Sequence, residues 1–240
     1  MNYLFLILLT MKTTRHLLSI FCLAIILVPA YAQEKTKQLS DSLTIHYTLN
    51  DQQKLDGLYS LKDKSGETLL RGLYKNGERV GNWFAFNKDK STFLRYNYAS
   101  KQILELDADQ MQKAKIRVQG GSKQSTQDAR IPFPVFPLEI YIDLIQEKAK
   151  NEIPSYQRNP QAPILAEITA EIDATGETRY SLKYILENKT FNTQFKFEEP
   201  YLDFSWVPAQ YQDQALPSTF TVFAEILYPD APDHKRVIWK

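Results

Sequence analysis

A tripeptide that recurs between glycines limits what this chain can fold into more than any other feature. Gly57-Leu-Tyr59 returns fifteen residues later as Gly72-Leu-Tyr74. Lys64-Ser65-Gly66 lies between the two copies and Lys75-Asn76-Gly77 follows the second, and each of these runs ends in a glycine that can take the positive φ angle of a tight hairpin turn. The stretch from residue 55 to residue 86 therefore predicts successive β-hairpins.

Period-two alternation extends this pattern in both directions. Residues 43–49 alternate apolar and polar side chains, as a half-buried strand does, and residues 92–98 and 102–106 form a further pair. We therefore expect an antiparallel β-meander over residues 43–118, with about six strands. Residues 33–42 are polar and show no periodicity, so they are expected to be a flexible lead-in.

The first 32 residues differ from the rest of the chain because they contain no Asp or Glu. Lys12 and Arg15 precede an apolar run from Leu17 to Val28, and Ala30-Tyr31-Ala32 places small residues where a signal peptidase cleaves. This pattern predicts a signal peptide over residues 1–32. We expect cleavage near Ala32 and a periplasmic or secreted protein with no retained membrane span.

Two alternatives concern this leader. A retained membrane anchor would need about 20 apolar residues, which is longer than the run from Leu17 to Val28. Lipid attachment at Cys22 would need a small preceding residue, but Phe21 stands there. In a signal peptide, positive charges normally precede the apolar run. The chain has this order if translation starts at Met11 rather than at Met1.

Charge and cysteine content narrow the class of protein. The chain has 29 Lys and Arg against 28 Asp and Glu, so there is no basic excess to attract nucleic acid. Its one cysteine lies in the leader, so the cleaved protein would hold no disulfide, which suits a bacterial periplasm.

Composition changes sharply after the predicted meander. Residues 119–130 are rich in Gly, Ser and Gln and predict a linker between two domains. Prolines then predict an extended conformation for residues 131–137. This stretch either packs against a neighbouring surface or serves as a proline-rich ligand for a recognition domain. Apolar residues at helical spacing predict a helix over residues 138–150, ended by Pro154.

The last third of the chain predicts a second set of elements. Strands are expected over residues 164–172 and 179–186, joined by a turn at Asp173-Ala-Thr-Gly176. Residues 191–204 carry aromatic side chains three or four positions apart, which predicts a helix that Pro200 interrupts. A long strand is expected over residues 216–227.

Two resemblances to known families follow from these runs. Gly72-Leu-Tyr74-Lys-Asn-Gly77-Glu-Arg-Val-Gly81-Asn-Trp83 resembles the MORN-repeat variant of bacterial envelope and antitoxin-like proteins, over roughly residues 43–107. The first copy departs from the pattern because no Gly-x-Trp follows it. The resemblance implies a β-meander that serves as a scaffold or an interaction surface.

The second half resembles the C-terminal domain of TonB-type energy transducers, over roughly residues 138–228. The resemblance rests on three runs, Ala166–Gly176, Trp206-Val-Pro-Ala209 and Ser218–Phe223. It implies a small α+β domain over residues 131–240, in which an exposed edge strand accepts an extended peptide. The strand over residues 216–227, or its neighbour, is the candidate edge.

TonB-type transducers have a retained membrane helix and a long proline-rich spacer. The predicted leader of this chain is cleaved, and its predicted linker is short. The eleven residues 119–129 of the linker reach about 40 Å at about 3.5 Å per residue, too little to cross a periplasm. The Tyr-Pro pair expected near the start of the domain is replaced by Ile153-Pro-Ser-Tyr156. The expected fold class is thus α+β, with an N-terminal antiparallel β-meander of MORN-like hairpins followed by a TonB-like α+β domain.

Chemical motifs are sparse. Outside the leader the chain has His46 and His234, which fall in different predicted domains, and it contains no common catalytic or phosphate-binding motif. We therefore assign no catalytic, cofactor-binding or metal-binding residue. The predicted function is a non-enzymatic envelope protein that binds a protein partner or acts as a scaffold.

Aromatic residues and one proline are the candidate binding surface. The aromatic residues of the repeat either pack on one another as its core or form an exposed face for a protein or a glycan. The alternative function is an envelope protein that binds or hydrolyses glycans through Trp83, Trp206 and a pair of acids. The candidate residues are Tyr59, Tyr74, Trp83, Phe86, Trp206 and Pro208.

Overall fold

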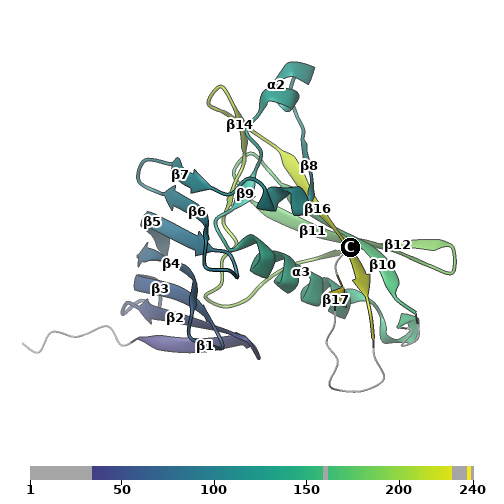
Figure 1. Ribbon diagram of the computed structural model, residues 1–240, viewed down its shortest axis with the longest axis horizontal. Helices are drawn as coiled ribbons and strands as arrows, with labels where there is room; N and C mark the ends of the chain where they lie inside the picture. The colour runs from purple at the N-terminus through teal and green to yellow at the C-terminus, as the bar shows by residue number, and fades with distance from the viewer. Residues whose placement is uncertain (1–33, 159–161, 229–236, 239–240) are drawn as a thin grey trace, which may run out of the picture. The chain divides into compact units, whose positions relative to one another are not determined.

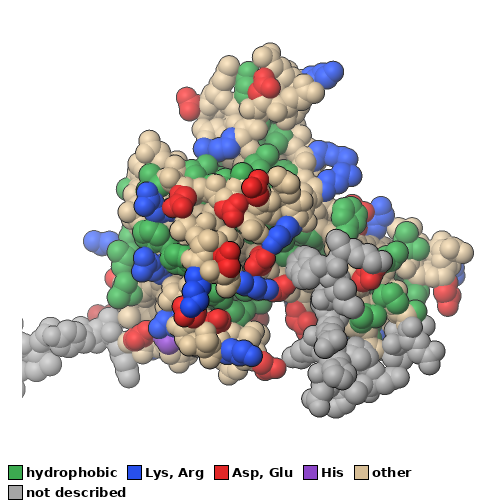
Figure 2. Space-filling model, in the orientation of Figure 1, with side chains coloured by type: hydrophobic (Ala, Val, Ile, Leu, Met, Phe, Trp, Pro, Cys, Tyr) green, Lys and Arg blue, Asp and Glu red, His purple; other side chains and the backbone are tan. Residues whose placement is uncertain are grey.

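The computed structural model describes residues 34–158, 162–228 and 237–238. The predicted signal peptide, Cys22 and His234 lie outside these residues. Within the described ranges, no helix is both long and apolar enough to span a membrane. The described residues from Glu34 onward form one compact unit, which is mostly antiparallel β-sheet with few helices (Figure 1). On the face drawn in Figure 2, acidic and basic side chains are interspersed over the described residues.

The recurring tripeptides lie in a seven-stranded sheet whose strands follow one another in sequence order (Figure 1). Every neighbouring pair is antiparallel, so the sheet is a meander. Its strands are β1 (Lys35–Ser40), β2 (Leu43–Leu49), β3 (Leu55–Asp63), β4 (Thr68–Lys75), β5 (Glu78–Phe86), β6 (Thr92–Asn97) and β7 (Gln102–Leu106).

Strand β1 corrects the expectation of a flexible lead-in over residues 33–42. It pairs with β2, with Lys37 opposite Ile45, and adds a strand to the six that were expected. An edge strand is held by backbone hydrogen bonds on one side only and buries few side chains, so its sequence need not alternate. The absence of periodicity therefore did not exclude a strand here.

The second sheet has six strands in the order β12-β11-β10-β16-β17, with β8 also paired to β16. Its strands are β8 (Lys115–Val118), β10 (Ile164–Ile172), β11 (Thr178–Leu186), β12 (Lys189–Phe195), β16 (Ser218–Ile226) and β17 (Val237–Ile238). The strands predicted over residues 164–172, 179–186 and 216–227 correspond to β10, β11 and β16.

Strand β8 corrects the predicted boundary between the two halves. It falls in the stretch assigned to the meander, but it pairs with β16 of the second sheet. The chain leaves the first sheet after β7 through the 3-10 helix η1 (Gln110–Lys113). The predicted linker then contains a short helix, α2 (Lys123–Asp128), whose first turn is capped by the side chain of Ser122.

The main helix, α3 (Leu138–Glu152), lies between the two sheets (Figure 1). The predicted apolar face is buried, but so are Ile140, Tyr141 and Gln146. A helix covered from two sides buries more than one stripe of side chains. The short 3-10 helix η2 (Ser155–Gln157) follows α3.

The helix expected over residues 191–204 is wrong, because Lys189–Phe195 form β12. Phe191 and Phe195 are four positions apart, and this spacing places two side chains on one face of a helix and equally on one face of a strand. Their pairing opposite Tyr184 and Tyr180 of β11 resolves the ambiguity in favour of the strand.

The proline-rich stretch, predicted to be extended over residues 131–137, is a strand at Phe133–Pro134 and bends at Val135 and Phe136. Its strand β9 (Phe133–Pro134) pairs with β13 (Trp206–Val207). A last small hairpin joins β14 (Ala209–Tyr211) to β15 (Gln214–Leu216).

Candidate functional site

The aromatic residues of the repeat form one cluster on three successive strands. Tyr59 on β3, Tyr74 on β4 and Trp83 on β5 are buried, and their ring centroids lie 5.1–5.7 Å apart. Aromatic rings at such distances stabilise a core. These rings are therefore core residues, as the first of the two interpretations expects, and they do not form an exposed face.

The two equivalent glycines of the repeat are needed for different reasons. Gly57 has a φ of +106°, which side chains rarely permit, whereas a Cβ atom at Gly72 would lie 2.3 Å from the indole of Trp83. Gly72 is also directly opposite Tyr59, and Gly57 is opposite Tyr74. The glycine of the second copy thus leaves room for an aromatic ring, and the glycine of the first copy permits the backbone conformation.

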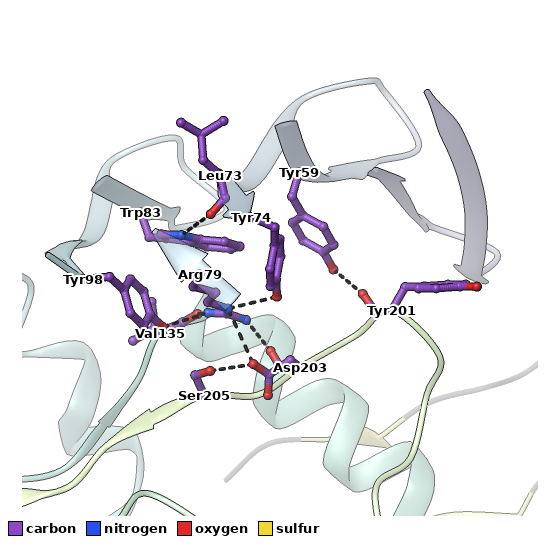
Figure 3. A network of polar contacts seen from close by, with 10 residues as sticks. All are labelled: Tyr59, Leu73, Tyr74, Arg79, Trp83, Tyr98, Val135, Tyr201, Asp203 and Ser205. Atoms are coloured by element: carbon purple, nitrogen blue, oxygen red, sulfur yellow. Dashed lines mark hydrogen bonds and ion pairs between the residues drawn. The ribbon is translucent and has the colours of Figure 1, made fainter. Parts of the chain in front are cut away.

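Arg79 on β5 lies beneath this cluster (Figure 3). Its side chain is only 3% exposed, and its guanidinium carbon lies 4.1 Å from the centroid of the Trp83 ring. Its Nε donates to the hydroxyl of Tyr74 at 3.1 Å. Burial alone would lower the pKa of Arg79, but the nearby tyrosines and Asp203 raise it, so the guanidinium stays charged.

The other contacts of Arg79 reach into the second half of the chain. One terminal nitrogen donates to the carbonyl of Val135 at 2.8 Å, and the other donates to the carbonyl of Asp203. The carboxylate of Asp203 lies 3.6 Å from Nε and also accepts a hydrogen bond from Ser205. One buried cation therefore joins the first sheet to two separate segments of the second half (Figure 3).

Residues 199–205, which we call the strap, lie against the first sheet. The ring of Tyr201 stacks on Tyr47 with centroids 4.5 Å apart, and its carbonyl accepts a hydrogen bond from Tyr59 at 3.0 Å. Glu199 pairs with Lys37 at 3.0 Å. The strap begins four residues after β12 ends, so the contacts that hold the two halves together lie close in sequence to one end of β12.

Sequence reasoning did not single out Arg79, although a signal was present. Arg79, Trp83 and Ala85 occupy alternate positions of one strand, so period two places them on the same face. A charge on a face that otherwise carries core residues indicates a buried polar contact. Its partners could not be inferred, because they lie 56 and 124 positions away.

The remaining candidate residues are separate from this cluster. Phe86 is half-buried at the end of β5. Trp206 is buried in the second half, with ring centroids 5.4 Å from Tyr141 and 5.2 Å from Phe220. The candidate surface is thus not one surface, since four of its six members are core residues of two different sheets.

Two motifs of the second half do meet in space. A Cβ atom at Gly176, the last residue of the Asp173-Ala-Thr-Gly176 turn, would lie 2.4 Å from the carbonyl oxygen of Trp206 and 3.9 Å from Pro208. The positive φ of Gly176, +90°, lets the turn close against the Trp206–Pro208 corner. Pro208 itself is half-buried.

A groove of about 1450 Å³ runs between the hairpin turns of the first sheet and α3. Ion pairs cross it or border it, with Lys88 3.1 Å from Asp143 and Lys90 2.7 Å from Glu67. The buried side-chain amide of Gln146 lines it and has no hydrogen-bond partner among the described residues. Among the described residues, no three His, Cys, Asp or Glu side chains are placed to hold a metal ion.

The sheet edges differ in how well they are protected. Natural proteins guard an edge strand with charges, proline, bulges or short length. Strand β1 carries two lysines and a break in register, and β7 is five residues long with Glu105 and another break beside it. Strand β16, the predicted edge, is covered by β8 over residues 218–221 and by β17 over residues 225–226. The expectation of an open edge along β16 is therefore wrong.

Strand β12 has fewer of these protections, because its one charged residue is Lys189 at its first position. Its seven residues pair with β11 in unbroken register, and no charged residue or proline occurs from Thr190 to Phe195. It ends the order of the second sheet, and no strand among the described residues pairs with its outer side. Its outward backbone groups are therefore available for hydrogen bonds to another chain.

Comparison with known proteins adds no assignment, since no family model, curated protein or solved structure matches this chain.

Proposed function

We propose that this protein is a non-enzymatic binding or scaffold protein of the bacterial cell envelope, and that it recognises an extended segment of a protein partner by β-strand addition along β12. The open edge of β12 is the observation that carries this proposal. The predicted leader supports an exported protein. The sequence runs described above support a MORN-like first half and a TonB-like α+β second half.

The side chains of β12 define what kind of segment fits. Phe191 and Phe195 lie on the α3 side of the sheet and stack on Tyr184 and Tyr180, with centroids 5.1 and 5.4 Å apart. The alternate residues, such as Asn192, are polar and exposed. A segment added to this edge would therefore continue an apolar row on one face and a polar row on the other, so it would itself alternate.

The first sheet acts as the scaffold in this proposal. It holds the strap through Lys37, Tyr47, Tyr59 and Arg79, and the strap begins four residues after β12 ends. A rigid edge costs less ordering entropy on binding than a free one, so this anchoring favours strand addition.

A display library of random peptides, selected on the purified protein, tests the proposal. Selected peptides are then synthesised with N-methyl groups on alternate residues, in the two possible phases. Strand addition uses only every second backbone N–H of the added strand, so one phase should abolish binding while the other has little effect.

Equal effects of the two phases would contradict strand addition. Binding of peptidoglycan fragments in the same assay, with no peptide selected, would instead favour the glycan-binding alternative.

A further inference from the structure

The second sheet has one face covered by α3 and one face that bears exposed side chains. On β10 the buried residues are those of alternate positions from Ile164 to Ile172, and the residues between them are exposed or half-buried. Strand β11 shows the same alternation. We call the side opposite α3 the outer face.

Large apolar side chains gather at one end of the outer face. Leu165 on β10 is 60% exposed, Ile185 on β11 is 54% exposed and Phe223 on β16 is 56% exposed. Ala166 is opposite Tyr184, which places Leu165 beside Ile185, and Phe223 is opposite Glu167, two positions along from Leu165. A cluster of this kind indicates an interaction site, whereas single exposed apolar residues are ordinary.

Charges on the outer face are separated by strand. Strand β10 contributes Glu167 and Glu171, and β11 contributes Lys183 and Arg179. The register places Glu167 opposite Lys183 and Glu171 opposite Arg179, so an acidic column runs beside a basic column. The apolar pair of Leu165 and Ile185 continues the same two columns.

This arrangement is self-complementary about one axis. A two-fold axis that runs parallel to the strands, between β10 and β11, would place the β10 of one copy over the β11 of the other. Glu167 would then face Lys183 of the second copy, Glu171 would face Arg179, and Leu165 would face Ile185. Face-to-face packing of two sheets with strands within about 30° is a common arrangement.

The outer face is also large enough for a stable dimer interface. The nine residues of β10 measure about 30 Å, and four strands at about 4.8 Å spacing measure about 19 Å, which gives roughly 570 Å² of planar area per copy. Two copies would bury more than about 1,100 Å², because projecting side chains add to the planar area, and stable interfaces begin near about 1,200 Å².

We infer that the outer face of the second sheet is the interface of a two-fold symmetric dimer of this protein, with the β10 column of each copy over the β11 column of the other. The interface does not use the outer edge of β12. It is therefore independent of the proposed function, and both copies would keep a free β12 edge.

The test uses protein purified from cells that express the whole chain, with mass measured by analytical ultracentrifugation over a wide concentration range. The wild type should have twice the monomer mass. The double substitution Glu167→Lys with Glu171→Lys makes both columns basic, and Arg179→Glu with Lys183→Glu makes both acidic. Each double variant alone should be a monomer, and an equimolar mixture should form dimers that contain one copy of each.

Two further measurements serve as controls for this test. Thermal unfolding of each variant shows that it is folded. Ile185→Asp should give a monomer, whereas the matched change Leu58→Asp, at a side chain that is 75% exposed on the first sheet, should leave the dimer intact. A monomeric wild type at every concentration, or folded charge variants that self-associate as the wild type does, would overturn the inference.

Discussion

Arg79 is the residue on which the joining of the two halves depends most. Its guanidinium is buried, lies on Trp83 and donates to carbonyls of two distant segments. A buried charge is costly unless it is paired and hydrogen-bonded, and here both conditions are met. We infer that the geometry of the Trp83 cluster and that of the strap are coupled through this side chain.

Replacing Arg79 by methionine tests that role. Arg79→Met keeps most of the side-chain volume but leaves the carbonyl of Val135 and the hydroxyl of Tyr74 without their donor. We expect the free energy of unfolding, measured with urea, to fall by about 2–4 kcal/mol. The control is Arg117→Met on β8, where the arginine is exposed and a change within about 0.5 kcal/mol is expected. Equal losses at the two positions would contradict the account of Arg79.

Gly72 permits a second test at the same scale. A methyl group there would overlap the indole of Trp83, so Gly72→Ala should lower the free energy of unfolding by about 1–3 kcal/mol. The control is Gly66→Asn, because Asn tolerates the positive φ of Gly66 and a Cβ atom there meets nothing within 4 Å. Chemical unfolding followed by tryptophan fluorescence would measure both, and a neutral Gly72→Ala would show that the ring can move aside.

At the scale of elements, the proposed function depends on the open edge of β12. Asn192→Lys adds the charge with which natural edge strands are protected, and the exposed position should tolerate it. We expect the affinity of the selected peptides to fall by about tenfold or more, with little change in the free energy of unfolding. The control is Thr36→Lys on β1, which should leave peptide affinity unchanged. Titration by fluorescence anisotropy would measure the peptide affinity of both variants.

The elements also show which features the sequence could predict. The hairpins from Leu43 to Leu106 and strands β10, β11 and β16 follow from period-two alternation and turn residues, which are local signals. The polar edge strand β1 could not be predicted in this way, and Phe191 and Phe195 fit two periods equally. The pairing of β8 with β16 depends on contacts about one hundred residues apart, which no local pattern encodes.

The candidate site was less predictable than the fold. Mutual packing of Tyr59, Tyr74 and Trp83 was one of two interpretations that the repeat allowed, and the structure shows these rings in contact. That Trp206 is buried, and that the open edge is β12 rather than β16, depends on how the strands are ordered in the sheet. Strand order is a property of the tertiary fold and is only weakly constrained by local sequence.

Buried tyrosines make alkaline pH a test of the whole molecule. Burial raises the pKa of Tyr180 to about 12 and that of Tyr228 to about 12, and it raises the pKa of Tyr141 and Tyr59 as well. The folded state therefore binds more protons than the unfolded state above about pH 10, so the free energy of unfolding falls as pH rises.

We expect stability to be constant up to about pH 10 and then to fall toward about pH 12, with Tyr180 alone contributing on the order of 2–3 kcal/mol. Urea unfolding across this range gives the slope, and phenolate absorbance should increase together with loss of structure. Tyr180→Phe should make the decline less steep. A profile that stays flat above pH 10 would contradict the burial of these rings.

The most direct test of the central claim is amide hydrogen exchange across the whole protein, with and without a saturating peptide from the display selection. Strand addition along β12 predicts new protection at residues 189–195, because the outward N–H groups of an open edge exchange freely until a strand covers them. It also predicts little change at β1, at β7 and in the groove beside α3. Protection that appears at any of those places while β12 is unchanged would contradict the claim.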